Sequence, residues 1–377
     1  MAGQVIVRDL FLSVGELGLD DVSLSLVAGA ASDANRLRAS YTGAAEYLFV
    51  PHAKRFSPEW VSNRVASRFL KRDLGLNRFL KREAIDVFFG YCIMLKYWGL
   101  ATLSWIPDFQ HVRLPEMFSQ GEIEARDRDF RTTAEMATRV VLLSRAVQAD
   151  FRERFPTLAS KTRVLSPVSR IAPSIYQSDP GDIVKQFNLP ERFFYVPNQF
   201  WRHKNHELVF RAVAELKRRG VAVNVVCTGY PSDHRHIQHF TSLWEKVSRW
   251  DIRDQVIYLG QVPHLDVFKL IRQAVCVLNP SRFEGWGISV DEARSVGKRI
   301  LASSIPSHLE QDAPAASYFD PESVEDLQDK MVEIWERAKG GPDHDLEEVA
   351  RRAQPERLRN YGAQFVTIAR EAQASLR

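Results

Sequence analysis

Short apolar runs alternate with longer amphipathic stretches along most of this 377-residue chain. The runs have the length of buried strands, and the stretches between them have the spacing of helices with one apolar face. In the first half, the runs that predict strands are residues 22–27, 47–50, 85–89, 101–105, 140–143 and 163–165. In the second half they are residues 193–196, 221–227, 255–259, 275–278 and 299–302. This alternation predicts an α/β fold with parallel strands.

The length of the chain predicts two domains, because one hydrophobic core rarely serves so many residues. The stretch 166–190 is rich in Ser, Pro, Asp and Gln and marks the boundary. We therefore expect an amino-terminal domain over residues 1–175, a second domain over 176–354 and a carboxy-terminal helical segment over 355–377. Ser144 is expected to cap a helix that begins near Arg145.

Composition excludes several classes of protein. The three cysteines, Cys92, Cys227 and Cys276, have no paired spacing, which argues against a disulfide framework and favours a reducing compartment. No apolar run is long enough to span a bilayer, and the amino terminus lacks the pattern of a signal peptide. The net charge of +4 is too small to indicate nucleic-acid binding. We expect a cytoplasmic protein.

The most informative segment is residues 279–293, where a glycine turn follows an apolar run and leads into a helix. Gly285 and Gly287 let the backbone approach a ligand closely, and the start of a helix favours an anion such as phosphate. Glu284 and Glu292 would repel a phosphate. We therefore expect these carboxylates to bind hydroxyl groups of a sugar or ribose that is attached to it.

The Glu, seven residues, Glu pattern in its Phe-Glu-Gly-Trp-Gly context resembles the family 4 (group 1) retaining glycosyltransferases, in particular mannosyltransferases. The resemblance implies the GT-B fold, in which two Rossmann-like doubly wound domains face a cleft and the carboxy-terminal helix packs back on the first domain. It implies that Glu284 contacts the donor sugar and Glu292 the ribose, with Trp286 and Ile288 in the same donor-binding turn. It also implies that the first domain binds the acceptor and the second the nucleotide.

Two further strand ends in the second half carry candidate donor-binding residues. The segment 196–206 resembles the family's Arg-Lys-Asn element, whose cations hold the donor diphosphate, and Lys204 followed by Arg202 are its candidates. Gly229 lies in a small turn after residue 227 that would border the base or ribose, although an ordinary loop explains it equally well.

In the first domain, His111 follows the strand 101–105 and is expected on a loop that faces the cleft. The resemblance places a histidine here close to the transferring sugar, so His111 joins Glu284 and Lys204 as a catalytic candidate. The alternative is a histidine that only packs. Asp108 would brace the loop through a local hydrogen bond.

No metal or cofactor is expected. Asp127 and Asp129 mimic a metal-binding motif, but they lie in a charge-rich helical stretch and are expected to be solvated, pointing apart. His234, His236 and His239 lack supporting carboxylates or cysteines and are expected in an exposed loop. Cationic groups and the helix start would instead neutralise the diphosphate.

Basic and apolar residues alternate over 54–82, which favours an anionic membrane surface. A peripheral position on the inner membrane face would bring the protein to a lipid-linked acceptor. The alternative is that the aromatic residues of this segment belong to the core.

These features predict a retaining hexosyltransferase that uses GDP-mannose or a similar nucleotide sugar and a glycan or lipid-linked acceptor, in polysaccharide or lipopolysaccharide synthesis. One departure is that the chain starts directly in a predicted helix, residues 5–19, without the family's first strand and glycine turn. Either the start was assigned downstream of the true one, or the domain lacks this edge element. The alternatives are a sugar-nucleotide epimerase of the same fold and an inactive sugar-nucleotide-binding subunit.

Overall fold

The computed structural model describes residues 2–28, 46–50 and 57–376, and it divides into two compact units. The first unit comprises Met1–Val112, Ser119–Val168 and Glu356–Arg377, and the second comprises Arg113–Phe118 and Ser169–Pro355. All strand pairs among the described residues are parallel, as the alternation of strands and helices predicted.

A six-stranded parallel sheet in the order β12-β11-β10-β7-β8-β9 forms the centre of the second unit. Its strands are β7 (Phe194–Val196), β8 (Val225–Cys227), β9 (Val256–Tyr258), β10 (Cys276–Asn279), β11 (Ile300–Ser303) and β12 (Ala316–Phe319). The first five coincide with predicted strands, although β8 is shorter than its apolar run. The sixth, β12, was not predicted.

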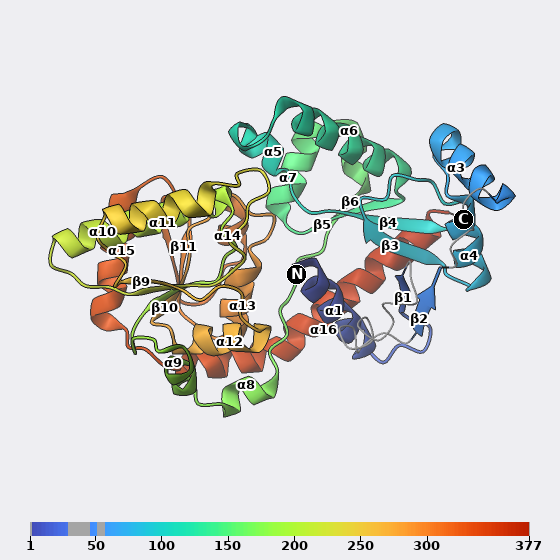
Figure 1. Cartoon of the computed structure of the whole chain (residues 1–377). Coiled ribbons are helices and arrows are strands. Elements are labelled where there is room, and N and C mark those ends of the chain that lie inside the picture. The colour runs from blue at the N-terminus through green and yellow to red at the C-terminus, as the bar shows by residue number, and fades with distance from the viewer. Residues whose placement is uncertain (1, 29–45, 51–56, 377) are drawn as a thin grey trace. The chain divides into compact units, whose positions relative to one another are not determined.

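Helices cover both faces of this sheet (Figure 1). The apolar sides of α10 (His206–Arg218), α11 (His239–Arg249) and α15 (Val324–Arg337) share one core with the sheet. A second core joins the other face to α8 (Pro173–Gln177), α9 (Gly181–Phe187), α12 (His264–Gln273) and α13 (Ile288–Val296). The unit is therefore doubly wound, with a helix α14 (Pro306–Glu310) after β11.

The strands of the first unit form two parallel sheets among the described residues. One pairs β1 (Ser25–Ala28) with β2 (Glu46–Phe49), and the other has the order β3-β4-β5-β6. The latter strands are β3 (Val87–Tyr91), β4 (Ala101–Ile106), β5 (Arg139–Leu142) and β6 (Thr162–Val164). Each overlaps a predicted strand.

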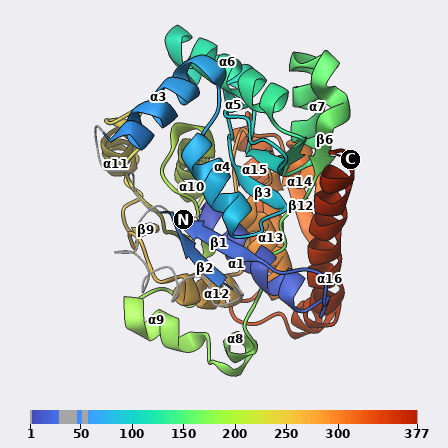
Figure 2. The ribbon, with the colours of Figure 1, turned by 90° about the vertical axis from the view of Figure 1, so that its right-hand side faces the viewer.

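The helices of the first unit lie before and between its strands. They are α1 (Ala2–Gly15), α3 (Pro58–Leu70), α4 (Leu74–Arg82), α5 (Gln110–Arg113), α6 (Gln120–Met136) and α7 (Arg145–Arg154). Figure 2 shows α3 and α4, which follow each other in the chain. The Ser144 hydroxyl accepts a hydrogen bond from the backbone N–H of Val147 at 3.1 Å, which confirms the predicted cap of α7.

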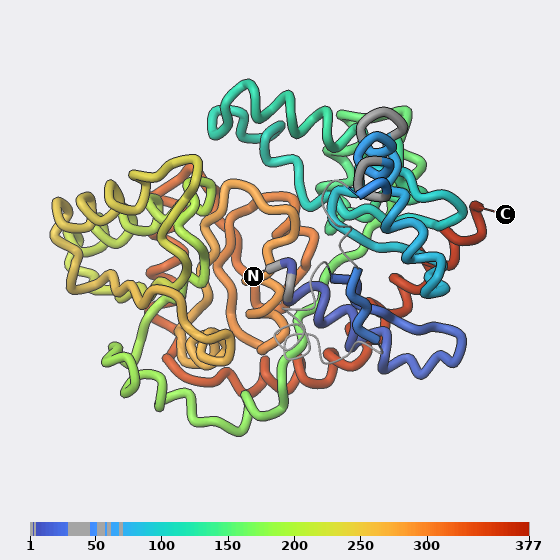
Figure 3. Tube along the Cα trace, turned by 45° about the vertical axis from the view of Figure 1, so that its right-hand side comes forward, coloured from blue at the N-terminus to red at the C-terminus, as the bar shows by residue number. Residues whose placement is uncertain are grey.

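The last helix, α16 (His344–Ala374), begins before the predicted start at residue 355 and contributes its second half to the first unit. There Tyr361 and Phe365 share a buried cluster with Leu10 and Val14 of α1. Figure 3 shows the red tube of α16 passing the dark-blue tube of α1 before it reaches the C-terminus. The expected packing of the carboxy-terminal helix on the first domain is confirmed.

Candidate donor site in the second unit

Parallel strands place the loops that follow them at one edge of the sheet, and two of these loops carry the main predicted residues. Lys204 ends the 3₁₀ helix η4 (Arg202–Lys204) after β7, and Glu284 lies in the turn after β10. Strands β7 and β10 are neighbours, and the chain continues from them in opposite directions across the sheet. Ligands of doubly wound sheets bind in the crevice at such a switch point.

Lys204 and Glu284 form an ion pair between Nζ and Oε1. Only 15% and 11% of their side chains are exposed, so each charge compensates for the desolvation of the other. The Ser281 hydroxyl donates a second hydrogen bond to Glu284 Oε1 at 2.7 Å. Burial alone would raise the pKa of Glu284, but the positive charge of Lys204 and its hydrogen bond lower it to about 2. Glu284 is thus ionised and acts only as a hydrogen-bond acceptor.

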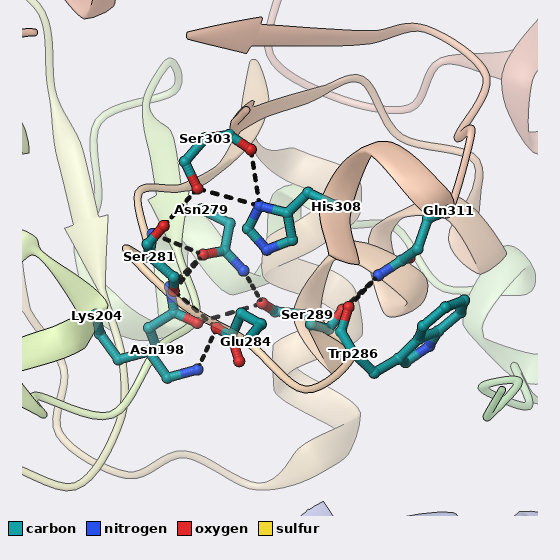
Figure 4. A network of polar contacts seen from close by, with 11 residues as sticks. Asn198, Lys204, Asn279, Ser281, Glu284, Trp286, Ser289, Ser303, His308 and Gln311 are labelled. Carbon is teal, nitrogen blue, oxygen red and sulfur yellow. Dashed lines mark hydrogen bonds and ion pairs between the residues drawn. The ribbon is translucent and has the colours of Figure 1, made fainter. Parts of the chain in front are cut away.

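A buried network of polar side chains supports the turn that carries Glu284 (Figure 4). Asn279 at the end of β10 accepts from the Ser281 N–H at 3.2 Å and donates to the Ser289 hydroxyl at 2.8 Å. Ser289 in turn donates to Asn198 Oδ1, 3.2 Å away in the loop after β7. The network ties the loops after β7 and β10 to the start of α13, so it fixes the position of Glu284 relative to Lys204.

His308 in α14 adds a hydrogen-bond acceptor under the glycine turn. The Ser303 hydroxyl donates its one hydrogen to Ser281 O at 2.5 Å, so the Ser303 Oγ and O atoms, 3.1 and 3.0 Å from His308 Nδ1, are both acceptors. Nδ1 therefore carries the ring hydrogen. Burial lowers the pKa of His308 to about 4, which keeps the ring neutral and leaves Nε2 as an acceptor. That atom has no hydrogen-bond partner among the described residues.

Gly287 makes this turn possible. Its φ of 90° is in the left-handed region, and it is the residue before the first turn of α13. A Cβ at this position would lie 3.0 Å from His308 Nε2, so the ring and the glycine pack against each other. The Gln311 amide donates to Trp286 O at 2.6 Å and Gly287 O at 3.2 Å. Gly285 lies between Glu284 and Trp286 in the same turn, and Ile288 begins the helix.

Glu292 lies in α13, five residues after Gly287, and has a different partner from Glu284. Its Oε1 is 2.7 Å from Nε2 of His264, the first residue of α12, and only 9% of the Glu292 side chain is exposed. The structure therefore brings Glu292 next to the loop after β9. His264 was not among the residues predicted from the sequence.

Two other predicted residues come from neighbouring loops. The Gly229 N–H donates to Gly260 O at 2.9 Å, which joins the loops after β8 and β9. The side chain of Arg202 is exposed and lines a cavity between α10 and α11, whose lining does not include Lys204. The two cations predicted to bind the diphosphate therefore lie in different surroundings: Lys204 pairs with Glu284, whereas Arg202 lines the cavity.

His111 differs from its expected setting, because it lies in the short helix α5 and is fully buried. Its ring stacks on Phe109, and Nε2 is 3.2 Å from Asp127 Oδ1. The expectation that His111 lies on a loop was wrong, and its place at the cleft beside the sugar stays a prediction. Asp108 does brace this segment, since its Oδ1 accepts from the Gln110 N–H at 3.1 Å.

The two acids set aside as solvated behave differently from each other. Asp129 is half exposed on α6, as expected. Asp127 was wrongly expected to be solvated, because it contacts His111 and forms an ion pair with Arg154, with 16% of its side chain exposed. Helix α6 presents Asp127 toward α5 and α7.

The three histidines expected in an exposed loop differ from one another. His234 is exposed, His236 is half-buried, and the half-buried His239 begins α11.

Among the described residues, no group of three or more His, Cys, Asp or Glu side chains has the arrangement of a metal site. None of the described helices is long and apolar enough to cross a membrane.

The segment 54–82, which was predicted to meet a membrane surface, is only partly described, because residues 54–56 lie outside the described part of the chain. Phe79 and Leu80 are buried in a core cluster, which overturns their expected place on that surface.

Comparison with known proteins adds independent information on the second unit. Residues 182–353 match the family described as glycosyl transferases group 1. The O-antigen chain mannosyltransferase B of Escherichia coli is 34% identical over 83 residues, which cover 22% of this chain and 22% of that protein. The match thus spans about a fifth of the length of this curated relative.

Solved structures resemble the whole chain. A glycosyltransferase from Rickettsia africae has a TM-score of 0.67 at 12% identity, with 98% of this chain and 94% of that one covered. HepE of Anabaena, solved with UDP and glucose, has a TM-score of 0.63 at 14% identity and coverages of 98% and 95%. WaaG, a glycosyltransferase involved in lipopolysaccharide biosynthesis, has a TM-score of 0.57 at 17% identity and coverages of 98% and 95%.

The likeness to these structures establishes the GT-B fold, and the family match falls on the unit that holds the Lys204–Glu284 pair. Residues 182–353, which form most of that unit, are similar to the glycosyl transferases group 1 family.

Proposed function

We propose that the protein is a retaining glycosyltransferase that moves a hexose from a nucleoside diphosphate sugar to a hydroxyl group of a glycan or lipid-linked acceptor. The observation that carries this proposal is the buried Lys204–Glu284 pair beside the glycine turn that begins α13. A cation, an ionised carboxylate and a helix start at one switch point match the diphosphate and the sugar of such a donor.

Each group has a distinct role in this proposal. Lys204 would turn from Glu284 to the donor diphosphate and stabilise the charge that develops on it. Glu284, held ionised, would accept hydrogen bonds from hydroxyl groups of the donor sugar. The backbone of the turn from Gly285 to Gly287 would approach the diphosphate, and Glu292 would accept a hydrogen bond from the ribose.

The proposed reaction keeps the configuration of the anomeric carbon without a covalent enzyme intermediate. The bond between that carbon and the diphosphate oxygen breaks, the acceptor oxygen bonds from the same face, and the acceptor proton passes to the leaving phosphate. The side chains of the site then position the donor and stabilise charge, and none of the described residues is assigned as a nucleophile.

Substitution of the ion pair tests the donor site. Lys204→Met and Glu284→Gln should each lower kcat/KM at least about 100-fold, the usual effect of removing one charge-stabilising group. Lys217→Met is the matched control, because Lys217 forms an ion pair with Asp251 elsewhere in the same unit. Wild-type turnover in either site variant, with unfolding unchanged, would refute the assignment.

For the donor, we propose GDP-mannose or a similar nucleotide sugar. The Escherichia coli relative is named as a mannosyltransferase, whereas HepE was solved with UDP and glucose, so the choice of base needs a direct test. The nucleotide of the true donor should raise the unfolding temperature with the logarithm of its concentration. GDP should do so at concentrations at which UDP does not, and the reverse result would assign a UDP-sugar.

Product analysis separates this activity from two alternatives. With a panel of nucleotide sugars, a glycosyltransferase releases the nucleoside diphosphate, slowly by hydrolysis or faster once an acceptor is supplied. An epimerase would instead return an isomerised nucleotide sugar, and an inactive binding subunit would show ligand binding without any product. The family match favours the first outcome.

The place of action proposed here is a membrane surface in the synthesis of cell-surface polysaccharide or lipopolysaccharide. Trp98 is 68% exposed, and the guanidinium of Arg72 lies 4.7 Å from the centre of its ring. Leu74, two residues after Arg72, is 40% exposed. Such a basic and aromatic surface suits anionic headgroups. Trp98→Ser should lower the fraction bound to phosphatidylglycerol vesicles several-fold. Ile237→Ser, an exposed apolar residue of the second unit, should not.

A further inference from the structure

A cavity of about 490 Å³ lies between α10 and α11 in the second unit. One wall is formed by the α10 residues Glu207, Leu208 and Arg211, and the opposite wall by α11 residues that include Ser242 and Lys246. Arg202, Arg282 and Glu322 complete it. The cavity is separate from the Lys204–Glu284 pair, because neither of those residues lines it.

The charges of this cavity do not cancel. Lys246 forms an ion pair with Glu207 at 2.7 Å, and Arg282 forms one with Glu322 at 2.9 Å. These two pairs account for both carboxylates of the lining. Arg202 and Arg211 remain, both exposed, and their side chains make no hydrogen bond or ion pair with any described residue. The cavity therefore holds two uncompensated guanidinium groups.

The start of α11 adds to the positive potential. This helix of 11 residues begins at His239, and Gln238 before it supplies no side-chain cap. Both residues line the cavity, as does Ser242, whose hydroxyl can donate a hydrogen bond. Guanidinium groups bind phosphoryl oxygens in pairs, and a helix start favours the same charge.

We propose that this cavity binds a phosphoryl group, held by Arg202 and Arg211 at the start of α11, on a ligand distinct from the sugar donor. A phosphoryl group supplies two negative charges and several acceptor oxygens, which matches the two unpaired cations. The two ion pairs shape the cavity and keep Glu207 and Glu322 from repelling the ligand. This site is distinct from the donor site of the proposed transfer reaction.

The ligand would also reach the donor site through the backbone. Arg202 and Lys204 are the two ends of η4, and the Arg282 N–H donates to His203 O, in the middle of that turn, at 2.8 Å. A phosphoryl group bound to Arg202 would thus restrain the turn that presents Lys204. This contact gives the second site a direct route to donor binding.

Calorimetric titration of the full chain with inorganic phosphate, at constant ionic strength, tests the proposal. Arg211→Gln should weaken binding at least tenfold. Arg218→Gln is the matched control, because Arg218 lies exposed on the same helix outside the cavity and pairs with Glu215. Lys204→Met should also bind phosphate as the wild type does, which separates this site from the donor site.

Three results would overturn the proposal. They are wild-type protein that binds no phosphate at millimolar concentration, an Arg211→Gln variant with wild-type affinity, and loss of phosphate binding in Lys204→Met. Loss of phosphate binding in Lys204→Met would mean that the phosphate binds at the donor site, which is compatible with the proposed transfer reaction. Failure of Lys204→Met to affect turnover would instead count against the proposed function alone.

Discussion

The buried histidines of the second unit make its stability depend on pH. His206 is fully buried at the start of α10, and its ring stacks on Phe200 with centroids 4.1 Å apart. Burial lowers the pKa of His206 from 6.5 to about 3. Because the unfolded chain binds a proton that the folded chain excludes, this histidine costs stability as the pH falls below 6.5.

Replacing His206 with Phe should remove part of this acid sensitivity. Between about pH 7 and pH 5 one such histidine costs about 2 kcal/mol of unfolding free energy, because its unfolded pKa lies between these values and its folded pKa lies below them. Urea unfolding at both pH values measures the loss. The loss in His206→Phe should be smaller than in the wild type by about this amount, whatever its stability at neutral pH. An equal loss in both proteins would contradict the buried neutral state.

At this scale the sequence predicted positions better than environments. Lys204 and Glu284 were identified because their segments resemble elements of a known family, and their places after apolar runs agree with that, since parallel strands bring such loop residues to one edge. Burial of His111 was not predictable, since it depends on Phe109 and on Asp127, which is distant in the sequence. Asn279, Ser289 and His308 were missed as a network, although part of their signal was present. Asn279 directly follows a predicted strand and Ser289 lies at a predicted helix start, whereas His308 lies six residues beyond the strand predicted at 299–302.

At the scale of elements, the turn that begins α13 depends on Gly287. An alanine there would have a φ of 90° and a methyl group 2.9 Å from His308 Cδ2. Gly287→Ala should therefore destabilise the fold by about 1–3 kcal/mol and weaken nucleotide binding as the turn shifts. Denaturant unfolding and thermal shift with nucleotide measure the two effects.

Gly121 in α6 provides the control for this substitution. It lies in a helix with ordinary backbone angles, and a Cβ there has no neighbour within 4 Å. Gly121→Ala should be neutral or stabilise by up to about 1 kcal/mol. A Gly287→Ala variant as stable as Gly121→Ala would show that the turn tolerates a side chain.

Element prediction succeeded where one signal was strong and failed where signals were mixed. The strands predicted in the second half are continuous apolar runs such as β10, which suits strands buried on both faces. Strand β12 was missed because Ala-Ser-Tyr-Phe at the sheet edge is not a continuous apolar run and is only partly buried. The start of helix α16 was predicted too far along the chain, because a proline such as Pro355 is typical of the first turn of a helix. In the structure Pro355 lies inside the helix.

At the scale of the whole molecule, the chain returns to its first unit for the last time through α16. The division between the units falls directly after Pro355, a residue that has no N–H for the helix ladder. The two units have separate cores, and the end of α16 supplies five buried residues to the core of the first: Tyr361, Phe365, Val366, Ile368 and Ala372. A change in this helix end should therefore act on one core.

Phe365→Ala tests this division. Phe365 is 7% exposed and lies edge to face with Phe89 of β3 at 5.4 Å, so its loss should cost about 3–5 kcal/mol of the first unit's stability. Thr367→Ala on the exposed side of the same helix should change stability by less than about 0.5 kcal/mol. Hydrogen exchange reads the units separately: peptides from β3 to β6 should lose protection in Phe365→Ala, while those from β7 to β11 keep it. Because nucleotide is proposed to bind the second unit, its binding should survive the substitution. Equal loss of protection in both units would contradict this division. It would mean that the two units unfold together and that destabilising one end of α16 also destabilises the unit on the other side of Pro355.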